Sequence, residues 1–100
     1  MLIVAGYLYV SSEDIERFQG EFQTFAVATR QRKGNISYDA AIEDPKSGKL
    51  ILLERWTDQA ALSAHLNAID TVQFVNRWER LMRGDIRKYD ASNERDLMTQ

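Results

Sequence analysis

The sequence predicts a single α+β domain whose elements follow the order strand, helix, strand, strand, helix, strand. Runs rich in Val, Ile, Leu and Tyr predict the strands, and apolar residues at three- and four-residue spacing predict the helices. A chain of 100 residues fits one domain. We expect that domain to span residues 1–90 and to be followed by a polar C-terminal tail over residues 91–100.

Residues 2–10 are apolar at nearly every position, which predicts a strand covered on both faces. Ser11 and Ser12 are typical helix N-caps. The helix that follows has one apolar stripe, formed by Ile15, Phe18, Phe22, Phe25, Ala26 and Thr29. Gly20 interrupts it at a cost of about 1 kcal/mol relative to alanine, and a close contact is one explanation. Three basic residues complement the dipole at its end before Gly34, namely Arg30, Arg32 and Lys33.

Residues 35–43 and 49–56 are predicted strands around a turn that holds the only proline. Symmetric closure of this hairpin gives four facing pairs on one side of the sheet: Ile36 with Trp56, Tyr38 with Glu54, Ala40 with Leu52, and Ile42 with Leu50. The other side carries Ala41, Ile51 and Leu53 beside Ser37, Asp39 and Arg55. That side is too apolar for water, so we expect a homodimer packed through the sheet face.

Asp58 is predicted to cap a short helix whose stripe contains Ala61, Leu62, His65 and Leu66. Asp70 or Thr71 restarts a helix with the stripe Val72, Phe74, Val75, Trp78, Leu81 and Met82. Gly84 ends this helix, and residues 85–89 form a short fourth strand. The whole order predicts a ferredoxin-like arrangement, an antiparallel sheet with both helical layers on one side.

The composition excludes several classes of function. A formal net charge of −2 offers no basic surface for nucleic acid. The chain has no cysteine, which removes disulfides and thiolate chemistry. One histidine among scattered carboxylates is no metal-ligand set, and no phosphate-binding or dinucleotide-binding glycine loop is present. The first residues lack the pattern of a signal peptide or membrane span, so we expect a cytoplasmic protein.

Four short motifs, in order and spacing, resemble the antibiotic biosynthesis monooxygenase family. They are Gly-x-x-x-Tyr at Gly34–Tyr38, Glu-x-Trp at Glu54–Trp56, Asp-x-x-Ala-Leu-x-x-His at Asp58–His65, and the aromatic Phe74. The resemblance covers residues 2–89. It implies a dimeric α/β barrel with a pocket between sheet and helices in each subunit. In some members that pocket oxidises quinols or polycyclic aromatics with O₂ and needs no metal or flavin.

Two departures from the family pattern are visible. Residues 66–73 make a longer stretch between His65 and Phe74, which is expected to reshape the pocket mouth. The haem-degrading branch carries an Asn on the first strand and a late His. Here those regions hold Gly6, Tyr7 and Trp78, so haem degradation is disfavoured.

Three residues are candidates for catalysis. His65 could act as a base or orient a substrate oxygen, or it could simply pack on its helix. Glu54 could orient His65 or hold a raised pKa, although a structural ion pair is the favoured interpretation. Tyr38 could hydrogen-bond a substrate oxygen or serve as a half-buried strand residue. Three further aromatics could bind substrate as a wall or belong to the core: Trp56, Phe74 and Trp78.

The sequence leaves three functions open. The first is a cofactor-independent monooxygenase acting on a quinol or polycyclic aromatic substrate. The second is a non-catalytic ligand-binding or accessory dimer of the same fold, and the third is an isomerase. A cavity that touches His65 and a carboxylate would favour an enzyme, whereas a filled core around His65 would favour the accessory role.

Overall fold

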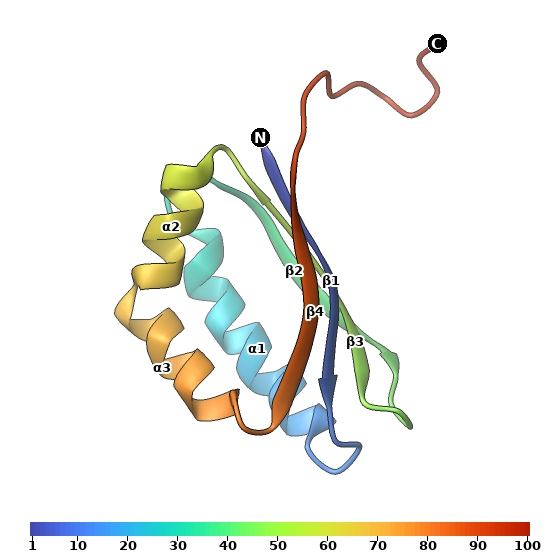
Figure 1. The fold of residues 1–100 in the computed structure, drawn as a ribbon, viewed down its shortest axis with the longest axis vertical. Helices are drawn as coiled ribbons and strands as arrows, with labels where there is room; N and C mark the ends of the chain where they lie inside the picture. Colours follow the sequence, from blue (N-terminus) through green and yellow to red (C-terminus); the bar gives the residue numbers. More distant parts are fainter.

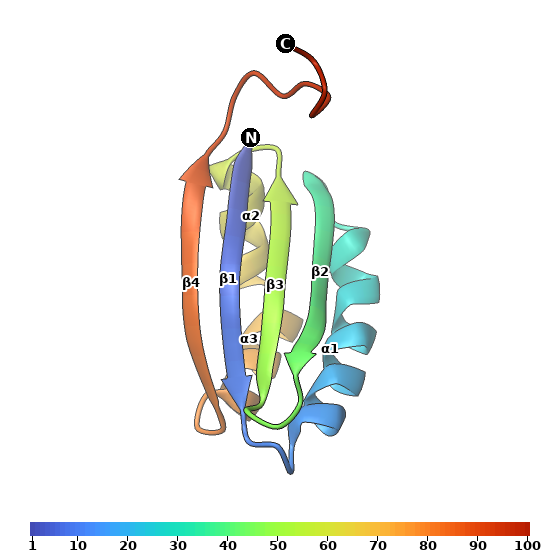
Figure 2. The same ribbon diagram turned by 90° about the vertical axis from the view of Figure 1, so that its right-hand side faces the viewer.

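The computed structural model describes all residues from 1 to 100. Its elements are β1 (Leu2–Val10), α1 (Ile15–Arg30), β2 (Asn35–Asp44), β3 (Lys49–Trp56), α2 (Gln59–Asn67), α3 (Ile69–Trp78) and β4 (Met82–Asp90). The four strands form one antiparallel sheet in the order β2-β3-β1-β4. All three helices lie against one face of this sheet (Figures 1 and 2). The predicted ferredoxin-like α+β fold is therefore confirmed.

The core lies between the sheet and the helices, and α1 supplies much of it. The predicted stripe is confirmed, with Phe18, Phe22 and Ala26 all buried. Phe18 meets the fully buried Trp78 of α3 edge to face, with 5.0 Å between ring centroids. Burial of side chains this large stabilises the fold by roughly 1.5–3 kcal/mol each, so this contact fixes α3 against α1.

The start of α1 differs from the prediction. Its N-cap is Asp14 rather than Ser11 or Ser12. The Asp14 carboxylate accepts hydrogen bonds from the Ser11 hydroxyl at 2.9 Å and from Arg17 at 3.1 Å. These two bonds lower the pKa of Asp14. The serine therefore contributes through the carboxylate and not as the cap itself.

A close contact does not explain the glycine at position 20. A Cβ added there would meet no atom within 4 Å, so packing does not require glycine. The basic residues near the end of α1 have specific partners beyond the helix dipole. Arg30 donates two hydrogen bonds to the carbonyl of Tyr38, and Arg32 binds both carboxylate oxygens of Asp70 at 2.6 Å.

The hairpin register is confirmed for three of its four predicted pairs, including Tyr38 opposite Glu54. The fourth is wrong, because a register shift between Asn35 and Ser37 places Asn35 opposite Trp56. Ile36 is the extra residue and is 44% exposed. The Asn35 side chain donates to the carbonyl of Ser37 at 3.0 Å, a local bond that accommodates the bulge.

The second helical region ends earlier than predicted. The Asp58 cap is confirmed, since its carboxylate accepts from the Ala61 amide at 2.8 Å. However, α3 ends at Trp78 and β4 already begins at Met82. Met82 pairs with Val10 along the edge of the sheet. The apolar residues after Trp78 fit a helical period and a strand alternation equally well, and backbone pairing with β1 decides in favour of the strand.

The sheet face away from the helices carries exposed aliphatic and aromatic side chains. Ile51 and Leu53 are both nearly half exposed. With Ala5, Tyr7 and Tyr89 they surround a shallow hollow of about 310 Å³. Figure 2 looks onto this face, and no segment of the chain crosses it.

Beyond β4, the last ten residues carry little regular structure and extend past the end of the sheet (Figure 1). Leu97 and Met98 in this tail are almost fully exposed. None of the helices has the length and apolar character that a membrane span requires.

Candidate functional site

A cavity of about 170 Å³ lies between the helices and the sheet. Apolar side chains dominate its lining, which consists of Leu8, Phe18, Phe22, Phe25, Tyr38, Leu52, Glu54, His65, Leu66, Thr71, Phe74, Val75, Met82 and Ile86. Four of the six candidates from the sequence line it, namely Tyr38, Glu54, His65 and Phe74. An apolar cavity with a few convergent polar groups is typical of a small-molecule site.

Three elements bring the polar groups of this cavity together. Tyr38 of β2 and Glu54 of β3 are direct cross-strand partners and both face the helices. The Asp58 cap fixes the start of α2, and Leu62 and His65 lie on the buried side of that helix. The His65 ring consequently sits 5.4 Å from the Tyr38 ring, measured between centroids.

Glu54 is a buried carboxylate without an ion-pair partner, so the expected structural ion pair is wrong. It is only 7% exposed, and none of the six ion pairs in the structure includes it. Its one hydrogen bond comes from Trp56 Nε1, which donates to Oε1 at 2.9 Å. Burial raises the pKa of Glu54 to about 7, although the bond from Trp56 opposes that rise.

His65 lies among aromatic rings. The ring of Trp56 is 4.9 Å away and that of Phe25 is 5.7 Å away. Nδ1 of His65 lies 3.4 Å from the hydroxyl of the buried Thr71, within hydrogen-bond range. The pKa of His65 falls to about 4, mainly because the ring is buried; the charge of Arg32 contributes to the fall and Asp70 partly opposes it. His65 is therefore neutral at pH 7.

Tyr38 keeps its hydroxyl proton at any physiological pH. Burial raises the pKa of Tyr38 far above its usual value, and the negative charge of Glu54 adds to the effect. The ring is held by a parallel stack on Phe22, with centroids 5.2 Å apart and an interplanar angle of 10°. Tyr38 is thus a fixed hydrogen-bond donor on the cavity wall.

Three polar atoms on the cavity wall make no hydrogen bond within the protein. They are the Tyr38 hydroxyl, Oε2 of Glu54 and Nε2 of His65. Only Gln19 and Arg32 have a side-chain atom that is both sealed from solvent and without a hydrogen-bond partner. The three cavity atoms are therefore not sealed, and they adjoin open space. Unpartnered polar atoms in an apolar cavity are costly unless a ligand or water satisfies them, so they are available to bind a ligand. The arrangement is suited to a planar molecule with polar substituents.

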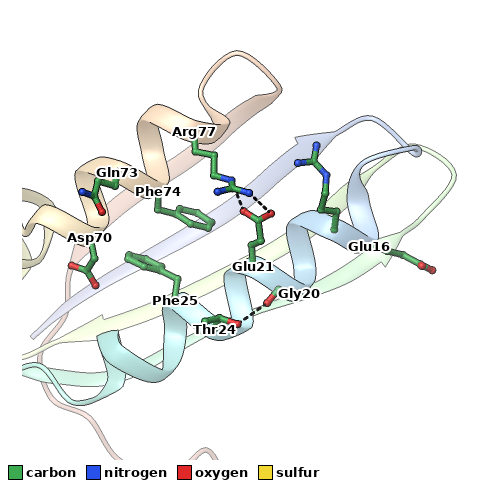
Figure 3. Close-up of a pocket in the computed structure, with 10 residues that line it drawn as sticks. Glu16, Gly20, Glu21, Thr24, Phe25, Asp70, Gln73, Phe74 and Arg77 are labelled. Carbon is green, nitrogen blue, oxygen red and sulfur yellow. Dashed lines mark hydrogen bonds and ion pairs between the residues drawn. The ribbon is translucent and has the colours of Figure 1, made fainter.

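The aromatic pair Phe25 and Phe74 separates this cavity from a larger groove on the surface. The two rings stack with centroids 4.7 Å apart and an interplanar angle of 8°. The groove, of about 620 Å³, runs between α1 and α3 (Figure 3) and is lined by Glu16, Arg17, Gly20, Glu21, Thr24, Phe25, Asp70, Gln73, Phe74 and Arg77. Its charges are largely paired, as Arg77 is with Glu21 at 2.8 Å. The smaller cavity is therefore the better candidate for chemistry.

Trp56 and Trp78 do not line the cavity. Trp56 is fully buried behind it and contacts both Glu54 and His65. Trp78 lies in the core under the groove, where Nε1 donates to Glu21 at 3.0 Å. No three His, Asp or Glu side chains cluster closely enough to ligate a metal ion.

The fold and the apolar cavity define a ferredoxin-like α+β protein with a site for a small molecule between sheet and helices. The profile of the family described as "Antibiotic biosynthesis monooxygenase" matches residues 1–79. The chain belongs to this family. It is 28% identical over 82 residues to the Bacillus subtilis (strain 168) protein named "Putative monooxygenase YcnE", covering 82% of this chain and 86% of that one.

Solved structures show the same fold. A Deinococcus radiodurans structure described as "a putative antibiotic biosynthesis monooxygenase" is 25% identical, with a TM-score of 0.88 over 99% of this chain and 100% of the other. PA3566 from Pseudomonas aeruginosa is 22% identical, with a TM-score of 0.80 over 92% and 94% of the two chains. The second of these similarities concerns the fold alone.

Proposed function

We propose that this protein is a monooxygenase that uses O₂ to oxidise a single-ring phenol or quinol (a hydroquinone) inside the 170 Å³ cavity. The observation that carries the proposal is the unpaired carboxylate of Glu54, which faces the same apolar space as Tyr38 and His65. Membership of the family and similarity to YcnE support the class of reaction. The substrate and the residue roles are inferred from the cavity.

The volume of the cavity favours one aromatic ring. An engineered apolar cavity of about 150 Å³ in another protein binds benzene, whereas drug-sized ligands occupy roughly 300–1,000 Å³. At about 170 Å³ the present cavity holds one ring with its oxygen substituents. A fused polycyclic substrate would require the stacked Phe25 and Phe74 rings to separate.

Glu54 is the better base of the two titratable candidates. A phenolic hydroxyl has a pKa of about 10. Transfer of its proton is less uphill to Glu54, with a pKa of about 7, than to His65, with a pKa of about 4. Three pKa units correspond to about 4 kcal/mol, a difference that decides the assignment.

The other two polar groups hold the substrate. The Tyr38 hydroxyl donates a hydrogen bond to the developing phenolate oxygen, a role that its retained proton permits. Neutral His65 binds a second oxygen through Nε2, while Nδ1 is engaged with Thr71. Trp56 Nε1 donates a hydrogen bond to Glu54 Oε1, which leaves Oε2 free to accept the proton of the substrate.

The reaction balances without any added reductant. Glu54 removes one hydroxyl proton, and the resulting anion transfers an electron to O₂. The superoxide and the ring radical then join through a new C–O bond at a ring carbon. Cleavage of the O–O bond leaves one oxygen on the ring and releases the other as water with two hydrogens of the substrate. A hydroquinone thereby becomes a hydroxyquinone and supplies all four electrons, so the proposal requires no cofactor.

We also propose that two copies of the chain pack through the outer sheet face. The support is the exposed apolar hollow bordered by Ile51, Leu53 and Tyr89. A second copy on this face would remove that apolar surface from water. The helices and the cavity lie on the opposite side of the sheet, so such a dimer leaves each cavity open.

The proposed function is tested by O₂ uptake with a panel of single-ring hydroquinones. We expect uptake above the spontaneous rate, and a loss of roughly 10²-fold or more in Glu54→Gln, which removes the base but retains the acceptor for Trp56. Glu13→Gln is the matched control, because Glu13 is exposed and remote from the cavity. Equal rates in the two variants, or no uptake above the spontaneous rate, would overturn the proposal.

A further inference from the structure

The exposed part of the cavity lining is apolar and forms the mouth of the cavity. Of its fourteen lining residues, three are exposed, and all three are aliphatic. Leu66 of α2 is 53% exposed, Val75 of α3 is 41% exposed and Ile86 of β4 is 37% exposed. The mouth therefore lies where these three elements meet. Single aliphatic side chains on a surface are ordinary. These three are different because they all line the same cavity, so they form one continuous apolar surface at its mouth.

The aliphatic surface continues from the mouth along α3. Val72 and Ile69 precede Val75 at three-residue spacing, which keeps neighbouring side chains on one side of a helix. Both are exposed. The mouth and these two residues form an aliphatic strip: Leu66, Ile69, Val72, Val75 and Ile86. Toward the groove of Figure 3 there is no such surface, because the stacked Phe25 and Phe74 rings line both the cavity and that polar groove.

The interior leaves no room for more than the ring. With one aromatic ring inside, a volume of about 170 Å³ is filled. The polar atoms of Tyr38, Glu54 and His65 face the interior and are not part of the mouth. A substituent that extends outward from the bound ring therefore passes the aliphatic side chains of Leu66, Val75 and Ile86.

We propose that the substrate is a single-ring phenol or hydroquinone that carries an alkyl chain, and that the chain lies across the aliphatic strip at the mouth. This inference rests on the proposed function and names the class of substrate for the same site. The ring enters first and satisfies the three unpartnered polar atoms. The chain then covers Leu66, Val75 and Ile86, which are exposed in the free protein.

The size of the expected effect follows from the burial of methylene groups. A fully buried methylene tightens binding about fourfold, and one covered by protein on a single side tightens it about twofold. Affinity should therefore rise between twofold and fourfold for each carbon added to the chain. The increase should stop once the chain passes the end of the strip.

The experiment measures binding separately from oxidation. Phenol and a series of 4-alkylphenols, from methyl to hexyl, are titrated into the full chain under nitrogen by calorimetry. Leu66→Ser and Ile86→Thr each replace one aliphatic residue of the mouth by a polar one, and the second keeps a residue that suits a strand. The matched control is Val27→Ser, because Val27 is exposed on α1 and does not line the cavity. Circular dichroism and sedimentation confirm fold and mass for each variant.

For the unmodified protein, Kd should fall twofold to fourfold per carbon over the first few carbons. In Leu66→Ser and Ile86→Thr the fall should shrink to less than about 1.5-fold per carbon, with the Kd of phenol itself unchanged. Val27→Ser should behave like the unmodified protein. An unchanged gradient in both mouth variants, or binding of phenol with no dependence on chain length, would overturn the proposal and leave the proposed function standing.

Two further results also count against it. If no phenol of any length binds, the proposed function fails together with this inference. If the mouth variants change the mass of the assembly, the aliphatic strip is an interface between copies of the chain, and the alkyl-chain proposal is wrong.

Discussion

Replacing Glu54 by glutamine should stabilise the folded protein at neutral and alkaline pH. The carboxylate is buried without a counter-charge, and burial raises its pKa from the usual 4.5 to about 7. Between these two pH values the folded protein keeps the Glu54 proton, while the unfolded chain releases it. The folded state is therefore progressively destabilised as pH rises through this window, and the penalty is complete above pH 7.

The size of this penalty follows from the pKa difference. At about 1.4 kcal/mol per pKa unit, the interval from 4.5 to about 7 corresponds to about 3 kcal/mol. Glutamine carries no charge and still accepts the Trp56 hydrogen bond through its amide oxygen. The gain in the free energy of unfolding for Glu54→Gln should grow from its low-pH value by about 3 kcal/mol between pH 4.5 and 8.

His65 conceals this effect in the unmodified protein. Burial lowers the pKa of His65 from 6.5 to about 4, so its contribution to stability is lost as pH falls through that range. The two buried groups therefore oppose each other between about pH 4.5 and 6.5. The difference between Glu54→Gln and the unmodified protein isolates the glutamate, because His65 contributes to both.

The assay is urea unfolding, followed by circular dichroism at several pH values from 4.5 to 8. The comparison of midpoints at constant m-value gives the difference in unfolding free energy. A difference that does not change with pH would refute the reasoning, since it would mean that Glu54 has an ordinary pKa. A variant that becomes less stable relative to the unmodified protein as pH rises would refute it more strongly.

Three further predictions concern other parts of the molecule. Gly20→Ala should raise the free energy of unfolding by about 0.5–1 kcal/mol in urea unfolding, because the added Cβ meets nothing within 4 Å; a loss of stability would contradict this. Thr71→Val should lower the free energy of unfolding by about 1 kcal/mol, because it leaves Nδ1 of His65 without its partner. An unchanged urea midpoint would show that the 3.4 Å contact between these side chains is not a hydrogen bond. Light scattering at micromolar concentration should give twice the mass of one chain, and Leu53→Arg should reduce it to that of one chain; a single-chain mass for the unmodified protein would remove the proposed dimer.

Much of the fold could be predicted because its signals are local. The spacing of Phe18, Phe22 and Ala26 gives the buried side of α1, and Asp58 marks the start of α2. The alternation in the hairpin places Tyr38 opposite Glu54 on the helix side of the sheet. The strand alternation therefore predicted the positions of Tyr38 and Glu54, and the helical spacing predicted the position of His65 on α2.

The remaining features depend on interactions that no local pattern encodes. The bulge at Ile36 arises from one extra residue, which an assumption of symmetric closure cannot detect. The early start of β4 depends on the pairing of Met82 with Val10 across the whole chain. Sequence spacing also put Trp78 on the same helix stripe as Phe74, although three-dimensional packing places Trp78 against Phe18 and away from the cavity.

Thr71 and Phe25 were missed as site residues for different reasons. Thr71 lies in the stretch between His65 and Phe74 that is longer than in the family pattern, and only the turn between α2 and α3 brings its hydroxyl to His65. Phe25 belongs to the stripe of α1 and reads as core from spacing alone. Its parallel stack on Phe74, which divides cavity from groove, is a tertiary contact.

The fate of the two oxygen atoms of O₂ tests the proposed oxidation most directly. The decisive measurement is mass spectrometry of the product formed from a single-ring hydroquinone under isotopically labelled O₂, with Glu54→Gln in parallel. The expected product is a hydroxyquinone that carries one labelled oxygen, formed roughly 10² times faster by the unmodified protein than by the variant. An unlabelled product, or labelled product formed equally fast by the variant, would contradict it.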